Sequence, residues 1–239
     1  MGKNNLIFGI HPLIEALEAG REIDKILLKR GLRSSEVSHI MDVAKERTIP
    51  VQIVPEERLT RLTRKQHQGV IAFISEIEYT QLDHLIPMLY EEGRSPFVVL
   101  LDGLTDVRNF GAIARTAECA GVDAIIIPER GSVSVTADAV KTSAGALHRI
   151  PVCRVSSIQA AVTLLQENGI QIVAASEKAA DIYTESELSL PLGLVLGAED
   201  HGVSQDVLRR ADKIVRIPQV GAIGSLNVSV AGGILIYEV

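Results

Sequence analysis

The feature that most constrains the fold of this chain is a series of short apolar runs that alternate with amphipathic segments from Phe97 onward. The runs at 98–101 and 125–127 contain no polar residue, which is typical of strands covered on both faces and therefore of a parallel sheet. The pattern predicts strands at 97–101, 124–127, 152–155, 170–174, 193–196 and 213–217, with helices near 109–120, 136–147, 156–168, 204–210 and 226–238. We therefore expect an α/β domain built on a parallel sheet.

A smaller α/β region precedes this series. The same patterns predict helices at 11–20 and 34–47, a short helix opened by Pro55, and strands at 23–28, 51–54 and 70–73. The segment that follows is charged and ends in Gly and Pro. We predict one domain over residues 1–75, a linker over 76–95 that carries one amphipathic helix from Thr80, and a second domain over 96–239.

The charge of the chain is distributed unevenly between these two regions. The net charge is −6, but residues 1–75 contain 12 Lys/Arg against 9 Asp/Glu, whereas residues 76–239 contain 12 against 21. The basic excess is concentrated in Lys25, Lys29, Arg30, Arg33, Arg58, Arg61, Arg64 and Lys65. Such a cluster suits the phosphates of a nucleic acid, although an ordinary solvated surface is an equally good interpretation.

Other features exclude several classes of protein. No apolar run approaches the roughly 18 residues of a membrane span, and the N-terminus has no signal pattern, so we expect a cytoplasmic protein. Cys119 and Cys153 lack CxxC or His spacing, so we expect two buried, reduced thiols and no metal site. The loop 197–202 is not a nucleotide-binding P-loop, because Val203 stands where that motif needs Lys.

The segment 102–117 contains two candidate functional residues. Asn109 stands where a helix is expected to begin, and its simplest role is an N-cap. Arg115 follows six residues later, about 9 Å along the helix axis, among Gly and Ala residues that indicate a close helix contact. An arginine in such a contact needs an anion to pair with, either a phosphate or a structural carboxylate.

Two later segments add further candidates. Glu199 directly follows a predicted strand, where α/β sheets place functional side chains, although it could instead cap the next helix. Ser225 is a plausible N-cap of the last helix, and Asn227 can donate through its amide. Gly232 and Gly233 cost about 1 kcal/mol each in a helix relative to Ala, so we expect a backbone, from another subunit or from the chain itself, to pass close to them.

Taken together, these three segments resemble the motifs of the SpoU/TrmH (SPOUT-class) RNA ribose 2′-O-methyltransferases. The likeness runs from 8–17 through 67–70 to the C-terminus. Within this class, the chain is most similar to the bacterial large-subunit rRNA guanosine-2′-O-methyltransferases of the RlmB group. It implies a small RNA-binding domain that resembles ribosomal protein L-thirty, followed by a SPOUT parallel-sheet domain with a C-terminal trefoil knot. It also implies S-adenosyl-L-methionine as cofactor, RNA as substrate and a homodimer.

The resemblance also implies roles for individual residues. The motif residues of the catalytic site fall on Asn109, Arg115, Glu199, Ser225 and Asn227. The cofactor contacts, largely through backbone atoms, fall on Leu196, Gly197, Ile217, Gln219 and Leu226. Gln219 departs from the family pattern, which usually has an apolar residue there. Three alternatives remain, namely a tRNA target, a non-catalytic ribosome-assembly protein and an enzyme that acts on a small nucleotide.

Overall fold

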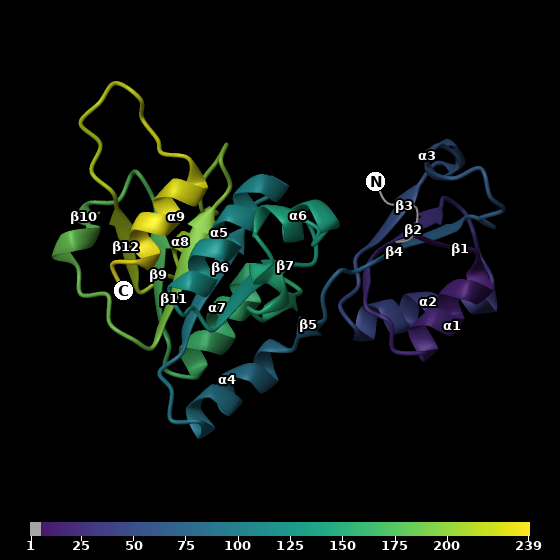
Figure 1. The fold of residues 1–239 in the computed structure, drawn as a ribbon, viewed down its shortest axis with the longest axis horizontal. Helices are drawn as coiled ribbons and strands as arrows, with labels where there is room; N and C mark the ends of the chain where they lie inside the picture. The colour runs from purple at the N-terminus through teal and green to yellow at the C-terminus, as the bar shows by residue number, and fades with distance from the viewer. Residues whose placement is uncertain (1–5) are drawn as a thin grey trace. The chain divides into compact units, whose positions relative to one another are not determined.

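The computed structural model describes residues 6–239, and the chain divides into two compact units, Met1–Glu78 and Tyr79–Val239. Figure 1 shows the helices and strands of each unit.

The first unit is a four-stranded sheet with helices on both faces. Its elements are β1 (Leu6–Phe8), α1 (Ile10–Glu18), β2 (Ile23–Lys29), α2 (Ser35–Glu46), β3 (Val51–Val54), α3 (Glu56–Leu62) and β4 (Val70–Ile74). The strand order is β1-β4-β2-β3, in which β3 is parallel to β2 and β4 is antiparallel to its two neighbours. The apolar sides of α1 and α2 pack on one face and α3 on the other. The sequence predicted all of these elements except β1.

The second unit is built on eight parallel strands. Its elements are β5 (Tyr79–Thr80), α4 (Leu82–Glu91), β6 (Phe97–Asp102), α5 (Val107–Cys119), β7 (Ala124–Pro128), α6 (Ala137–Thr142), the 3₁₀ helix η1 (Ala146–His148), β8 (Val152–Val155), α7 (Ile158–Glu167), β9 (Gln171–Ala175), β10 (Asp181–Ile182), the 3₁₀ helix η2 (Tyr183–Glu185), β11 (Leu192–Gly197), α8 (Gln205–Leu208), β12 (Lys213–Arg216) and α9 (Val228–Ile236). The strand order is β10-β12-β9-β11-β6-β7-β8-β5. The prediction of a parallel sheet is confirmed.

Helices cover both faces of this sheet because its central strands are apolar on both sides. Every residue of β11 is buried. In β6, Val98 and Leu100 join the core under α4, α7 and α8, whereas the alternate residues Val99 and Leu101 are buried on the opposite face. Figure 1 shows α5 lying between α9 and α6 on that opposite face. The sheet therefore forms the middle of three layers.

Most of the expected linker over residues 76–95 belongs to the second unit in the structure. The second unit begins at Tyr79, β5 pairs with β8 at the edge of the large sheet, and α4 buries Leu85, Ile86 and Leu89 in the core of that unit. The charge of this segment suggested a connector, but the two charged residues of α4, Asp83 and Glu91, are exposed while its other side is buried, and the remaining charged residues flank the helix.

Two other expectations were wrong in detail. Cys153 is buried, and burial raises the pKa of its thiol to about 12, but Cys119 is exposed at the end of α5.

The helix expected over 136–147 divides into α6 and η1, because Ala144 and Gly145 adopt positive φ angles of 52° and 87°, which an α-helix cannot contain.

The paired glycines of α9 face neighbours within the same chain. A Cβ atom placed on Gly232 would lie 2.8 Å from Leu196 Cδ1 of β11, closer than packed carbons allow. A Cβ atom on Gly233 would meet only Thr116 Cγ2 of α5, at an ordinary 3.9 Å. The approaching atoms come from the chain itself, but they belong to side chains and not to the backbone that was expected.

We predict opposite effects of alanine at these two positions. Gly233→Ala should raise the free energy of unfolding by about 0.5–1 kcal/mol, because alanine favours the helix and has room. Gly232→Ala should lower the free energy of unfolding, because overpacking typically costs about 1–3 kcal/mol and exceeds that gain. Denaturant unfolding of both variants at one protein concentration tests this, and a stabilising Gly232→Ala would contradict it.

Candidate functional site

A pocket of about 530 Å³ lies at the carboxyl ends of β9, β11 and β12, under the chain that leads into α9. Its floor includes the apolar side chains of Leu196, Val215 and Leu235, and its rim includes polar residues of the loops that follow the strands. β11 is inserted between β9 and β6 although it follows both of them in the chain. Open α/β sheets bind ligands at the carboxyl ends of strands where the strand order reverses in this way.

The structure brings together all five residues expected to contact a cofactor. Each lines the pocket: Leu196 and Gly197 at the end of β11, Ile217 and Gln219 after β12, and Leu226 before α9. Gln219, the residue that departs from the family pattern, is exposed at the rim. Their contact with a ligand stays a prediction.

Gly197 has a structural reason to lack a side chain. A Cβ atom there would lie 2.0 Å from the carbonyl carbon of Gly202 and 2.1 Å from the amide nitrogen of Val203. The loop that carries Glu199 folds back over this glycine, closed by two backbone hydrogen bonds between Ala198 and Gly202. Replacing Gly197 would therefore displace the loop as well as fill the pocket.

Three of the predicted catalytic side chains form one hydrogen-bonded chain beside the pocket. Asn109 Nδ2, in the first turn of α5, donates to Glu199 Oε1. Asn227 Nδ2 donates to Asn109 Oδ1 at 3.1 Å. Asn227 Oδ1 in turn accepts from the backbone N–H and the hydroxyl of Ser229 at 2.9 and 2.6 Å. Residues far apart in the sequence thus join three elements at one point.

The helix caps differ from those expected. Asp106, not Asn109, caps α5 by accepting from the N–H groups of Arg108 and Asn109. Asn227, not Ser225, caps α9. Since Asp106 satisfies the first turn of α5, the Asn109 amide is free to reach across to Glu199. Ser225 is exposed and lines the pocket.

Arg115 is not part of this cluster. Its side chain is exposed, it does not line the pocket, and within residues 6–239 no carboxylate forms an ion pair with it. The close helix contacts expected around it are made instead by Gly111 and Ile113 on other faces of α5.

Two features of the site were not anticipated. Asp102, at the end of β6, accepts a 2.8 Å hydrogen bond from the Ser204 N–H and so fixes the far end of the loop that carries Glu199. Ser176 and Lys178, after β9, also line the pocket. The sequence did contain a signal for these residues, because Asp102 and the segment with Ser176 and Lys178 each stand at or directly after the end of an apolar strand.

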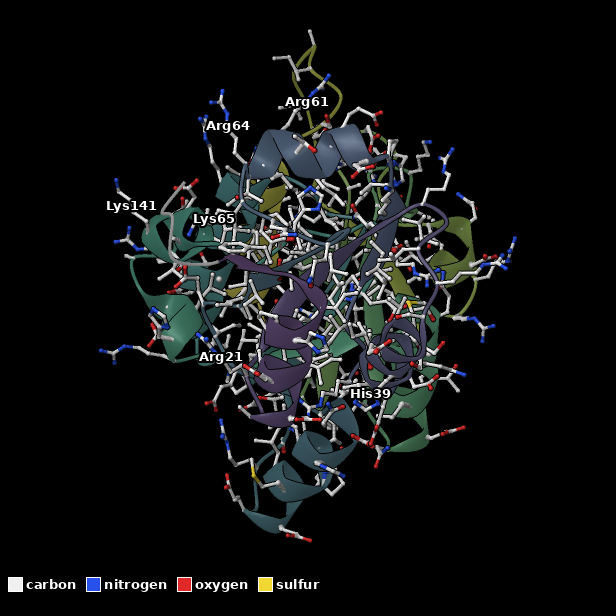
Figure 2. The ribbon with its side chains drawn as sticks, turned by 90° about the vertical axis from the view of Figure 1, so that its right-hand side faces the viewer. Arg21, His39, Arg61, Arg64, Lys65 and Lys141 are labelled. Atoms are coloured by element: carbon white, nitrogen blue, oxygen red, sulfur yellow. The ribbon has the colours of Figure 1, made fainter. Side chains whose placement is uncertain are left out.

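Basic residues also gather on the first unit. Figure 2 shows Arg61, Arg64 and Lys65 on α3 and the segment that follows it, and all three are exposed. The Lys65 ammonium lies 4.7 Å from the centre of the Phe8 ring. By contrast, Lys29 pairs with Glu56 at 2.5 Å, and this hydrogen bond lowers the pKa of the Glu56 carboxyl. Arg61, Arg64 and Lys65 form no ion pair with a carboxylate within the described residues.

Neither a membrane span nor a metal cluster occurs in the described part of the chain. No helix there is long and apolar enough to cross a bilayer, and residues 6–239 contain no group of three or more His, Cys, Asp or Glu that could hold a metal ion.

Comparison with protein-family models gave two matches. The model described as the SpoU rRNA methylase family matches residues 96–237. The model described as RNA 2′-O ribose methyltransferase substrate binding matches residues 6–80.

Curated relatives match over nearly the whole chain. A protein of Staphylococcus saprophyticus, provisionally named a TrmH family tRNA/rRNA methyltransferase, is 38% identical over 98% of this chain and 94% of its own length. A protein of the same name from Staphylococcus aureus strain MSSA476 is 37% identical over 99% of this chain and 96% of its own.

Solved structures also resemble this fold. The AdoMet-bound rRNA methyltransferase from Sinorhizobium meliloti has a TM-score of 0.61 at 26% identity, covering 98% of this chain and 85% of that one. The A. aeolicus TrmH/SpoU tRNA modifying enzyme has a TM-score of 0.56 at 28% identity, covering 66% of this chain and 81% of that one.

Asn227 caps α9 with its side-chain oxygen and donates a hydrogen bond to Asn109 with its amide. Substitution can separate these two roles. We predict that Asn227→Ala lowers the free energy of unfolding by about 1 kcal/mol, the typical value of a lost N-cap, and that Asn227→Ser restores most of it. Both variants should shift the NMR signal of the Asn109 side-chain amide, because neither replaces the Asn227 amide donor. Ser157→Ala, which removes the cap of α7, is the matched control. An unshifted Asn109 signal in Asn227→Ala would contradict the hydrogen-bonded chain.

Proposed function

The chain belongs to the SpoU rRNA methylase family, and from this premise we propose that it transfers the methyl group of S-adenosyl-L-methionine to the 2′-oxygen of a ribose in RNA. The observation that carries the proposal is the pocket at the carboxyl ends of β9, β11 and β12, with Asn109, Glu199 and Asn227 hydrogen-bonded beside it. The match of residues 6–80 to a substrate-binding model supports a ribose in RNA as the acceptor.

The residues present suit an adenosyl cofactor. The pocket volume of about 530 Å³ falls within the common range for small-molecule sites. Its floor of Leu196, Val215 and Leu235 suits an adenine ring, and the strand ends offer backbone groups to the polar parts. When bound, S-adenosylmethionine supplies a sulfonium methyl group that is already a good electrophile. The protein then has mainly to align the reactants and to remove a proton.

We assign the orientation of the ribose hydroxyl to Asn109 and Ser225. An asparagine amide has two N–H donors, and Asn109 uses one of them on Glu199. The second remains for a substrate oxygen. Ser225 lies at the pocket with its side chain exposed. The hydroxyl proton then passes to Glu199 or to water.

Arg115 serves in this proposal as a cation and not as a base. A guanidinium keeps its proton in a protein and so cannot act as a general base. It can bind the phosphate next to the target ribose and stabilise the developing alkoxide. Its exposure and its lack of an ion pair among the described residues leave it available for such a contact.

We propose that the enzyme is a homodimer in which Arg115 of one copy approaches the pocket of the other. Arg115 does not line the pocket of its own chain. Large apolar side chains are exposed around the start of α9, with Val220, Ile223 and Val230 at 104, 79 and 52%. Exposed apolar side chains that lie together often mark a protein interface, and in a two-fold dimer the same surface of each copy meets that of the other. Gly232→Leu would not test this interface, because a side chain at Gly232 meets Leu196 of the same copy.

The finer assignments rest on the resemblance. We propose a guanosine of large-subunit rRNA as the target and a trefoil knot formed where α9 packs against α5 and β11. A tRNA target is the second candidate, because the relatives are named for both RNAs and the A. aeolicus protein for tRNA. A non-catalytic role is disfavoured by the presence of every polar motif residue.

The activity is tested by incubating the protein with methyl-labelled S-adenosylmethionine and either rRNA or tRNA. We expect label in rRNA, in dinucleotides that resist alkaline hydrolysis, because a 2′-O-methyl group removes the nucleophile of that cleavage. Label confined to alkali-sensitive nucleotides would mean base methylation. Label confined to tRNA would refute the rRNA target alone.

Arg115 variants test both its charge and its position. Arg115→Ala should lower the methyl-transfer rate about 10²–10³-fold, the size of a lost preorganised donor. S-adenosylmethionine binding should remain unchanged, because Arg115 does not line the pocket of its own chain and in this proposal contacts the RNA phosphate and not the cofactor. Arg115→Lys should retain measurable activity with weaker RNA binding.

A mixing experiment tests the shared site. Mixing Arg115→Ala with Asn109→Ala, each inactive alone, should restore part of the activity if two copies share each site. Light scattering should give the mass of a dimer at micromolar concentration. A fully active monomer would contradict the shared site.

A further inference from the structure

The charge of the second unit is strongly uneven along the chain. The segment 103–155 contains six Lys/Arg and five Asp/Glu, whereas the rest of residues 76–239 contains six Lys/Arg and sixteen Asp/Glu. A polyanion is therefore repelled by most of this unit but not by the part that includes α5, α6 and η1. These three elements pack against one another.

The helical geometry of α5 fixes where its arginines lie. Arg108 and Arg115 are seven residues apart and so within about 20° of each other around the helix. Asn109 and Thr116, on the adjacent stripe, face α9 through the contacts with Asn227 and Gly233. The arginine stripe is exposed beside them.

The other side of this stripe is bounded by α6. A Cβ atom on Gly111 would lie 2.7 Å from Thr142 Cβ and 3.0 Å from the Ala139 carbonyl oxygen, so α6 crosses α5 at Gly111. The exposed stripe of α5 thus runs between α9 and α6, as Figure 1 also shows for the helices. On one side of this stripe is Asn109 of the site, and on the other side is α6.

Two further cations belong to the elements that pack against α5. Lys141 precedes Thr142 in α6, and Figure 2 shows its side chain extending away from the ribbon. Arg149 directly follows η1. Arg108, Lys141 and Arg149 are all exposed, and within the described residues none of them forms an ion pair with a carboxylate. We call these three residues the cationic ledge.

We propose that the cationic ledge binds phosphates of the RNA strand beside the target ribose, so that the second unit itself holds the substrate in addition to the basic cluster of the first unit. This inference rests on the proposed function. The ledge begins next to Asn109, which orients the ribose in that proposal, and the successive cations of α5, α6 and η1 can follow a backbone that carries one charge per nucleotide. An extended anionic strand fits this arrangement better than a single small anion does.

The test compares two double variants that remove the same charge from opposite helical layers. Lys141→Gln with Arg149→Gln alters the ledge. The control with the same change of charge is Arg209→Gln with Arg210→Gln. Both residues directly follow α8, which packs against α7 in the opposite layer, and Arg209 also loses its exposed ion pair with Asp206. RNA affinity is measured at several salt concentrations with rRNA fragments, together with methyl transfer, S-adenosylmethionine affinity and thermal unfolding.

We expect the ledge variant alone to bind RNA at least about tenfold more weakly, with the slope of log affinity against log salt reduced by about 1.5, the value for two lost phosphate contacts. Its cofactor affinity, unfolding temperature and rate at saturating RNA should match the control. Equal RNA affinity and slope in the two variants would overturn the ledge. An RNA-binding protein that shows these differences but methylates no RNA would refute the proposed function and leave the ledge standing.

Discussion

The close approach of α9 to β11 is the contact on which the arrangement of the site depends. Gly232 allows the helix to lie directly on Leu196 of the central strand, and this places the start of α9 beside the carboxyl end of β11. Asn227, the N-cap of α9, can then reach Asn109. Leu196 of β11 and Leu235 of α9 both line the pocket. A larger residue at 232 would change the packing, the pocket and the polar contacts together.

The polar chain beside the pocket is held in place by backbone and not by burial. Glu199 is exposed, and hydrogen bonds at the surface contribute little individually. Its loop, however, is fixed at both ends, by the Ala198–Gly202 bridge and by Asp102 at the end of β6. Because strands buried on both faces carry these anchors, exposed side chains keep a defined geometry while remaining accessible to a substrate.

Much of the second unit could be predicted because apolar runs mark buried parallel strands, and β8 agrees with its expected bounds at both ends. The short edge strands β1, β5 and β10 have few residues and no clear alternation, so periodicity could not identify them. Candidate site residues followed from motifs, but their contacts did not. Asn109 and Ser225 were expected as caps, and only the three-dimensional structure shows that Asp106 and Asn227 occupy those positions. The role of each site residue stays a prediction.

The sequence distances within the polar chain bear on how the protein folds. Asn109 is separated from Glu199 by 90 residues and from Asn227 by 118. Contacts between such distant residues form only after long loops have closed, which costs entropy before the contacts can stabilise the structure. The first unit contains no contact of that length, because all of its residues lie before Tyr79. During synthesis it can therefore fold early, and a chain still being completed presents its basic surface to RNA before it has a site that can act on it.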